Sequence, residues 1–272
     1  MSTQQYNGRA LITGASSGIG AVYADRLARR GYDLVLIGRD GRKLGAVADK
    51  IARETGRKVE PIVADLAVKT DTLKIEERLR ADSSITALVN NAGLGAAGAL
   101  LASDVDQLDT MIQVNVTALT RLARAAAPGF VARGSGAIIN IASIVAVAPE
   151  LLNGVYSGTK AFVVNFTQSL NNEVAAKGVR VQAVLPGAIR TDFWERSGLP
   201  ISSLPSEMIM SADELVDAAL AGFDQGELIT IPSLPDANDW ERFNSARLAL
   251  QPNLSRQHAA ARYKLAATTA RQ

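Results

Sequence analysis

Cysteine is absent from the 272-residue chain, and histidine occurs once, at His258. Without thiols the chain forms no disulfide, no thiolate metal site and no cysteine nucleophile. One histidine in a polar C-terminal region gives little basis for a histidine metal cluster or a Ser-His-Asp triad. Any chemistry performed by the chain must therefore use other side chains.

Long apolar runs and charge of one sign are lacking as well. No apolar segment reaches the roughly 18 to 20 residues that span a bilayer, and residues 1–8 lack the apolar core of a secretion signal. The 29 basic and 27 acidic residues nearly balance and are dispersed along the chain. We therefore expect a cytoplasmic protein with neither a nucleic-acid nor a membrane partner.

Short apolar or β-branched runs alternate with longer amphipathic stretches, and 47% of the residues are hydrophobic. The runs cover residues 9–13, 34–37, 59–63, 87–90, 137–142, 179–185 and 228–231. Helical patterns lie between them, near residues 19–30, 42–54, 69–80, 105–131, 155–177 and 212–223. Continuous apolar strands separated by helices predict an α/β fold with a doubly wound, seven-stranded parallel, Rossmann-like sheet.

No linker or second core is evident, so residues 1–272 are expected to form a single domain. Residues 189–211 lack clear periodicity and contain Gly198, Pro200 and Pro205, which indicates a lid or substrate loop. Residues 233–272 carry two modest helical patterns, near 239–250 and 255–267, and are expected to be a short helical appendage.

A glycine-rich turn follows the first predicted strand, with the sequence TGASSGIG at residues 13–20. Such a strand-to-helix turn presents backbone N–H groups and the positive end of the helix dipole to an anion. It lacks the Lys-Ser/Thr of a phosphoryl-transfer loop. Its position in the first βα unit favours a dinucleotide pyrophosphate over an ordinary tight turn.

The TGxxxGxG spacing resembles the short-chain dehydrogenase/reductase family. The resemblance covers residue 9 to about residue 231 and includes Asn90-Asn91-Ala92-Gly93, Ser143, Tyr156-x-x-x-Lys160 and Pro186-Gly187. It implies an oxidoreductase that transfers a hydride between nicotinamide and a carbonyl or alcohol carbon. The cofactor-binding residues expected from it and from the local chemistry are Gly14, Ser16, Ser17, Gly18, Ile19, Gly20, Arg39, Asp65, Leu66, Asn91, Ala92, Gly93, Tyr156, Lys160, Pro186, Gly187, Ile189 and Thr191.

Arg39 favours NADP(H) as the cofactor. Gly38 stands at the end of the second strand, where NAD-preferring enzymes place an acid, and Arg39 follows it. A guanidinium can pair with a 2′-phosphate through two hydrogen bonds. Asp65, just after the third strand, resembles the acid with which the family contacts the adenine. The alternatives are that Arg39 is a solvated turn residue, that Asp40 caps the next helix, and that Asp65 is another cap or turn aspartate.

Tyr156 and Lys160 lie at i and i+4 of a predicted helix, so their side chains share one face. A nearby cation is expected to lower the phenol pKa from about 10 toward a useful acid/base range. Ser143 would donate a hydrogen bond to the substrate oxygen. The resemblance makes Asn115 the fourth catalytic residue, holding a water in a relay with Lys160; a buried structural asparagine is the alternative.

The predicted substrate pocket consists of Ser143, Val145, Leu151, Tyr156, Phe193 and Trp194. Its apolar character favours an apolar or aromatic ketone or aldehyde, or the corresponding secondary alcohol. The alternatives are a 3-oxoacyl-thioester reductase of the same family and a non-catalytic NADP(H)-binding regulatory protein. Relatives usually pair the helices carrying Asn115 and Tyr156 across a two-fold axis, so a homodimer or homotetramer is expected.

Overall fold

The computed structural model describes residues 8–96 and 98–263. Its main sheet has seven strands in the order β3-β2-β1-β4-β5-β6-β9, and every pairing is parallel. The strands are β1 (Arg9–Thr13), β2 (Asp33–Gly38), β3 (Val59–Val63), β4 (Ile85–Asn90), β5 (Gly136–Ile141), β6 (Val179–Val184) and β9 (Ile229–Thr230). The order reverses between β1 and β4, as in a doubly wound fold. The predicted fold class is confirmed.

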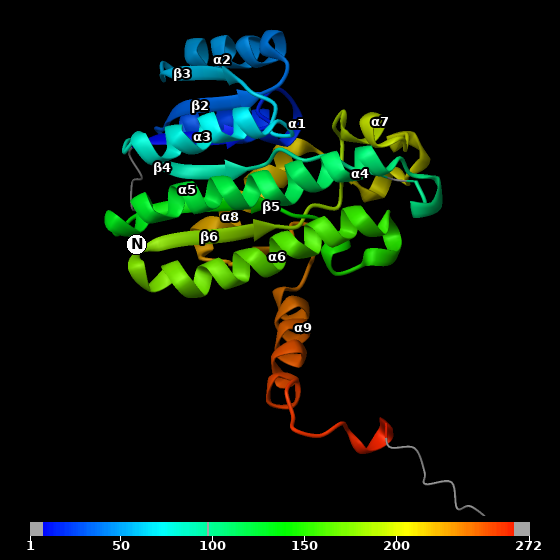
Figure 1. Ribbon diagram of the computed structural model, residues 1–272. Helices are drawn as coiled ribbons and strands as arrows, with labels where there is room; N and C mark the ends of the chain where they lie inside the picture. The colour runs from blue at the N-terminus through cyan, green and yellow to red at the C-terminus, as the bar shows by residue number, and fades with distance from the viewer. Residues whose placement is uncertain (1–7, 97, 264–272) are drawn as a thin grey trace, which may run out of the picture. The chain divides into compact units, whose positions relative to one another are not determined.

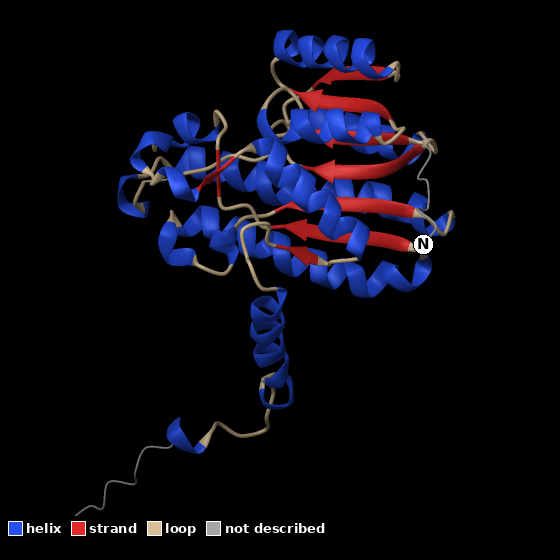
Figure 2. Ribbon diagram, turned by 180° about the vertical axis from the view of Figure 1, so that it is seen from behind, coloured by secondary structure: helices blue, strands red, loops and turns tan. Residues whose placement is uncertain are grey.

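Helices cover both faces of this sheet (Figures 1 and 2). One face packs against α1 (Gly18–Arg29), α2 (Gly41–Thr55) and α8 (Ala212–Gln225). The other packs against α3 (Lys69–Ala81), α5 (Leu119–Ala132) and α6 (Gly154–Val174). Because both faces are covered, the central strands are mostly apolar along their length rather than alternating.

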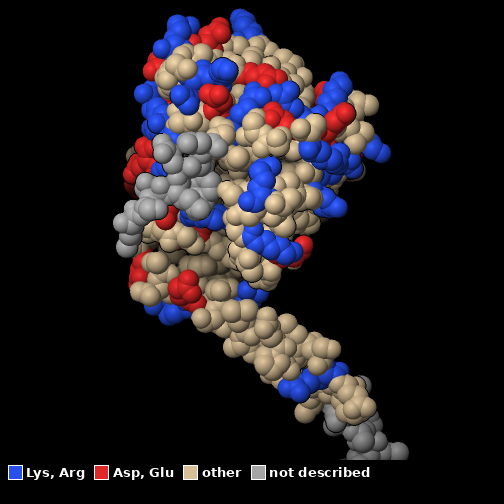
Figure 3. All heavy atoms as spheres, turned by 90° about the vertical axis from the view of Figure 1, so that its left-hand side faces the viewer, with Lys and Arg blue, Asp and Glu red and all other residues tan. Residues whose placement is uncertain are grey.

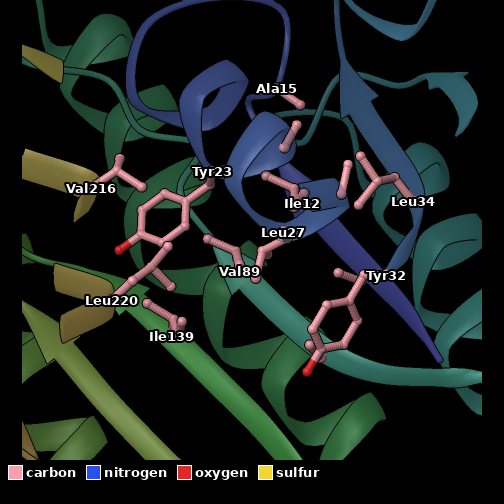
Figure 4. Packing of buried hydrophobic residues seen from close by; sticks show 14 of the residues in the cluster. Ile12, Ala15, Tyr23, Leu27, Tyr32, Leu34, Val89, Ile139, Val216 and Leu220 are labelled. Atoms are coloured by element: carbon pink, nitrogen blue, oxygen red, sulfur yellow. The ribbon is translucent and has the colours of Figure 1, made fainter. Parts of the chain in front are cut away.

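Tyr23 shows how the first face is packed. Figure 4 shows its ring, from α1, lying beside Val216 and Leu220 of α8 and Ile139 of β5. The side chain is fully buried, and its hydroxyl has no hydrogen-bond partner among the described residues. Tyr23 therefore contributes apolar surface to the core, and its polar end has no evident structural use.

The helix that carries Asn115 is not uniform. The sequence predicts one helix over residues 105–131, and the structure has α4 (Val105–Ile112), a π-helical segment (Gln113–Ala118) and α5 in succession. Such π segments are rare and often occur at functional sites. The predicted extent is right, but the local winding could not be read from the periodicity.

The proposed lid, residues 189–211, is more regular than its sequence suggests. It includes α7 (Phe193–Ser197), and β8 (Ile209–Met210) pairs in parallel with β7 (Ala188–Ile189). The lack of periodicity is therefore misleading, because two-residue strands and a five-residue helix are too short to show one.

By internal packing the chain divides into two units, Met1–Ser233 and Leu234–Gln272. The second contains α9 (Ala237–Ala249), none of whose residues is buried, and short 3₁₀ turns at Gln251–Asn253 and Ala261–Tyr263. The helix predicted near residues 239–250 is present. The one predicted near 255–267 is wrong over its described part, and residues 264–267 lie outside the described residues.

Basic and acidic side chains both occur on the face of the strand-bearing unit seen in Figure 3, where they are interspersed over its upper part. Ion pairs among the described residues include Arg9 with Asp82 at 3.0 Å and Arg78 with Glu60 at 2.6 Å. In the described part of the chain, no helix is both long and apolar enough to cross a bilayer.

Candidate active site

A cavity of about 730 Å³ opens where the parallel strands end. Its wall is built from the loops that follow β1, β2, β3, β4, β5 and β6, together with α6 and the lid. In doubly wound sheets this edge, at the point where the strand order reverses, is where ligands bind. One cavity thus joins the glycine-rich turn, Arg39, Tyr156 and the lid.

The glycine-rich turn forms one end of the cavity. Gly14 and Gly18 have φ of 67° and 54°, which side-chain-bearing residues rarely adopt. Ser17, the residue before α1, makes no side-chain cap bond with the described residues. The first-turn amides of α1 are therefore available to an anion.

Gly20 has a different role from the one expected. It is buried and does not belong to the cavity wall, and a Cβ at this position would lie 2.3 Å from the Gly14 carbonyl oxygen. The lack of a side chain lets α1 pack against the turn. The other predicted cofactor-binding residues all line the cavity.

Thr13 and Asn91 fix the turn to the end of β4. The Thr13 hydroxyl accepts hydrogen bonds from the Asn91 and Ala92 amides, both at 3.0 Å. In return, the Asn91 side chain donates to the Thr13 and Gly14 carbonyls at 2.9 and 3.2 Å. Thr13 was not among the predicted site residues, although it opens the motif that identified them. It positions the site rather than lining it.

Arg39 lies beside the predicted nucleotide end of the cavity. Its guanidinium is half-exposed and 3.9 Å from the Asp65 carboxylate, and Ser16 and Lys43 line the same region. Asp40 caps α2 by accepting a hydrogen bond from the Lys43 amide at 3.0 Å. The capping role weighed for Asp40 is therefore present, and Arg39 has no part in it. A guanidinium, an ammonium and a hydroxyl form a donor set suited to a phosphate monoester.

Ser143, Tyr156 and Lys160 converge at the middle of the cavity. Ser143 follows β5, and the two other side chains come from the first turns of α6. The Lys160 Nζ lies 5.8 Å from the centroid of the Tyr156 ring and donates a hydrogen bond to the Ile141 carbonyl at 2.9 Å. All three are buried. The predicted grouping of these side chains is present in the structure.

Burial changes the proton affinity of both groups. It raises the pKa of Tyr156 to about 12, although a hydrogen bond with Ser143 acts in the opposite direction. Burial also lowers the pKa of Lys160 to about 8. The net direction for the phenol is upward in the chain by itself, because loss of solvent penalises tyrosinate more than its neighbours stabilise it. That Lys160 lowers the phenol pKa stays a prediction.

Asn115 does not line the cavity, whereas its neighbour Val114 does. Its side-chain oxygen accepts a hydrogen bond from the Leu94 amide at 2.8 Å. Its amide group donates to the Leu94 carbonyl at 2.9 Å and to the Thr159 hydroxyl at 3.1 Å. These bonds join the π segment to the loop after β4 and to α6. The water relay with Lys160 stays a prediction.

The other end of the cavity is apolar. All six predicted pocket residues line the cavity. Phe193 lies against the Tyr156 ring with centroids 5.8 Å apart, and the buried Trp194 indole donates to the Ile189 carbonyl at 2.8 Å. Of the other apolar lid residues, Leu199, Leu204 and Met208 also line the cavity, but Ile201 and Met210 do not. Gly95, which the sequence reasoning missed, also lines the cavity, in contact with Phe193 of the lid.

A doubly wound parallel sheet, an anion-binding turn after β1 and a buried Ser-Tyr-Lys group define a dinucleotide-dependent oxidoreductase. Residues 9–199 match the family model described as short chain dehydrogenase. The chain belongs to this family and is an oxidoreductase acting on CH–OH and carbonyl groups. The family predicted from the sequence motifs is confirmed.

Solved structures resemble the chain over nearly its whole length. A short-chain dehydrogenase from Sphingobium yanoikuyae in complex with NADPH is 48% identical, with a TM-score of 0.92, and the match covers 94% of this chain and 100% of that one. The bulky-bulky ketone specific alcohol dehydrogenase from Comamonas testosteroni is 46% identical, with a TM-score of 0.87 and coverage of 94% and 98%.

A relative of known activity is less similar. The very-long-chain 3-oxoacyl-CoA reductase of Anas platyrhynchos is 38% identical over 189 residues. The match covers 67% of this chain and 60% of that protein, so this chain spans less than two thirds of its length.

Proposed function

We propose that the chain is an NADP(H)-dependent reductase of apolar or aromatic ketones and aldehydes, which also oxidises the corresponding secondary alcohols. The observation that carries the proposal is the single cavity in which an apolar wall meets Tyr156 and Ser143. A substrate whose carbonyl reaches these two hydroxyls would place its carbon groups against leucine, valine and aromatic side chains. Such a wall favours apolar groups over sugars or charged acids.

NADP(H) is supported by two independent observations. Arg39, Lys43 and Ser16 line the nucleotide end of the cavity, and a neighbour 48% identical to the chain was solved in complex with NADPH. Gly38 is buried, and a Cβ there would lie 3.2 Å from Leu44 and 3.4 Å from Ser16. An acidic side chain at position 38 would be crowded, which argues against the arrangement of NAD-preferring enzymes.

When bound, NADPH supplies the hydride that adds to the carbonyl carbon. Tyr156 then donates its proton to the carbonyl oxygen, while the Ser143 hydroxyl hydrogen-bonds the negative charge that develops there. The Lys160 ammonium stabilises the tyrosinate that remains. The raised pKa of Tyr156 keeps the phenol protonated at neutral pH, which is the form that reduction requires.

A 3-oxoacyl-thioester reductase is the second candidate, favoured by the 38% identical reductase from Anas platyrhynchos. A thioester of coenzyme A would need cationic side chains near the lid to hold its phosphates. Arg190 is exposed there, but it does not line the cavity. The apolar ketone is therefore the better supported substrate. We further propose a cytoplasmic homodimer or homotetramer, on the family pattern of helix pairing.

The test is NADPH oxidation with a panel of apolar, aromatic, sugar and acyl-thioester carbonyls, using the wild-type chain and Tyr156→Phe. We expect turnover of apolar carbonyls by the wild type, and a decrease of about 10²–10⁴-fold in Tyr156→Phe with NADPH binding retained. Tyr23→Phe is the matched control, because it removes a buried hydroxyl outside the site. Undiminished turnover in Tyr156→Phe would overturn the mechanism. A substrate ranking led by acyl thioesters would overturn the substrate class.

A further inference from the structure

Phe193 and Gly95 contact each other across the cavity. Phe193 belongs to α7 of the lid, whereas Gly95 lies in the loop that follows β4, and both line the cavity. A Cβ built on Gly95 would lie 2.2 Å from Phe193 Cζ and 2.7 Å from Cε2, far inside van der Waals contact. The phenyl ring therefore occupies the volume that any side chain at position 95 would need.

The same ring covers the reactive tyrosine. Phe193 packs against the buried cluster formed by Leu108, Met111, Val145 and Tyr156. Its ring is tilted by 46° to that of Tyr156. Because Phe193 and Tyr156 line the same cavity, we expect a substrate carbonyl at the Tyr156 hydroxyl to place one of its two carbon groups near this ring. The position of Phe193 thus limits the size of that group.

Phe193 has few bonds of its own, while its neighbour is anchored. Trp194 is buried and hydrogen-bonded to Ile189, and its ring meets Phe193 edge-on at 5.7 Å. The Phe193 backbone amide makes a long bond of 3.4 Å to the Thr191 hydroxyl. The Phe193 ring is held by apolar contacts alone, so it can change rotamer without moving the anchored indole.

We propose that Phe193, seated over Gly95, is a steric gate that sets the size of the smaller group on the substrate carbonyl, and that Gly95 is a specificity-determining position because it leaves room for the ring. This inference rests on the proposed function, which supplies the carbonyl. With the ring seated, a ketone with one small group fits beneath it. A ketone bulky on both sides binds only when the ring is displaced, and its apparent affinity is reduced by the rarity of that state.

Three variants test the gate. Gly95→Ala should displace the Phe193 ring from the position that it occupies next to residue 95, and Phe193→Ala removes the ring. The double variant combines the two substitutions. Gly98→Ala is the matched control, because it lies in the same loop and its Cβ meets no described atom within 4 Å. Neither Gly95 nor Gly98 has a positive φ, so alanine strains the backbone at neither position.

The first measurement is structural and needs no turnover. Crystal structures of Gly95→Ala and Gly98→Ala should show the Phe193 ring displaced only in the former. A ring that stays seated in Gly95→Ala overturns the steric part of the proposal. The second measurement is the kcat/KM ratio of a diaryl ketone to an aryl methyl ketone, with NADPH saturating.

Gly95→Ala and Phe193→Ala should each raise this ratio about tenfold or more, the discrimination typical of shape in an apolar pocket. Gly98→Ala should leave it unchanged. The effect of Gly95→Ala should disappear in the Phe193→Ala background, because contacting residues are not additive. A ratio unchanged in both single variants, or an effect of Gly95→Ala that persists without Phe193, overturns the gate. If the wild type reduces no carbonyl, the proposed function fails and the crystal structures alone decide whether the ring is displaced.

Discussion

Burial acts on Tyr156 and Lys160 in opposite directions, because it penalises whichever form of each group is charged. The pKa of the phenol is raised to about 12, and the pKa of the ammonium is lowered to about 8. At neutral pH the site therefore contains a neutral acid beside a cation, which is the combination needed to protonate a carbonyl oxygen and stabilise the resulting phenolate. In the proposed mechanism, the residue types supply the reacting groups, and their burial favours carbonyl reduction at neutral pH.

The pH dependence should differ between the two directions. Ketone reduction needs a protonated Tyr156 and a charged Lys160, so its kcat/KM should be level near pH 7 and fall as pH rises through about 8, where Lys160 loses its proton. Alcohol oxidation needs tyrosinate, whose fraction grows with pH at every value below the Tyr156 pKa of about 12, so its rate should rise with pH. Initial rates from about pH 6 to about pH 10 in both directions check this. A reduction rate that increases with pH would contradict the roles assigned.

Arg39 should determine the preference for NADPH over NADH. Loss of a bidentate, charge-assisted contact of about 1.5–3 kcal/mol should weaken NADPH binding by roughly 10- to 150-fold in Arg39→Ala. NADH, which lacks the 2′-phosphate, should bind much as before. Fluorescence titration of both nucleotides measures the two dissociation constants. Arg42→Ala is the control, since Arg42 does not line the cavity; equal losses for both nucleotides in Arg39→Ala would refute the assignment.

At the scale of elements, α6 carries Tyr156 and Lys160 on one face and an exposed glycine, Gly158, between them in sequence. A methyl group added to Gly158 would meet no described atom within 4 Å outside its own helix. Glycine within a helix costs about 0.5–1 kcal/mol relative to alanine, because it loses more conformational freedom on folding. Among the described residues of a single chain, no packing contact of α6 offsets that cost at this position.

Gly158→Ala should therefore raise the free energy of unfolding by about 0.5–1 kcal/mol and leave turnover unchanged. Chemical denaturation followed by circular dichroism measures the change. Gly178→Ala should lower the free energy of unfolding, since Gly178 has φ of 81° and a Cβ there would lie 2.1 Å from the Gly134 carbonyl oxygen. A loss of stability in Gly158→Ala would show that the helix tolerates no methyl group beside Tyr156.

At the scale of the whole molecule, the cavity is built within one unit. All of its lining residues lie between Gly14 and Met208, within Met1–Ser233. The other unit contains α9, whose thirteen residues include none that is buried. The two units thus differ in how far their structure depends on an apolar core.

A chain ending at Ser233 should remain folded and bind NADPH with a dissociation constant within about twofold of the full chain, because truncation tolerance follows the burial of the affected segment. Thermal melting with and without NADPH, together with titration, checks this. Loss of NADPH binding in a truncated chain that still melts cooperatively would assign residues 234–272 a part in the site. Light scattering on the same samples would show whether those residues affect oligomeric state.

The fold and most of the site follow from the sequence for a local reason. A buried parallel strand needs a continuous apolar run, and a phosphate-binding turn needs glycine where φ is positive, so β1 (Arg9–Thr13), Gly14 and Gly18 are evident without coordinates. Tyr156 and Lys160 share a face because of helical spacing. Such features depend on neighbours in the chain.

Only the tertiary structure decided what depends on residues distant in the chain. Gly20 packs against Gly14 instead of lining the cavity, and Asn115 lies in a π segment while bonding Leu94. The Tyr156 pKa rises because surrounding elements exclude water. The contact of Phe193 with Gly95 joins positions far apart in the chain, which no local pattern encodes. Sequence spacing determined the reaction class, and side-chain packing across the cavity determined the shape of the space in which a substrate would react.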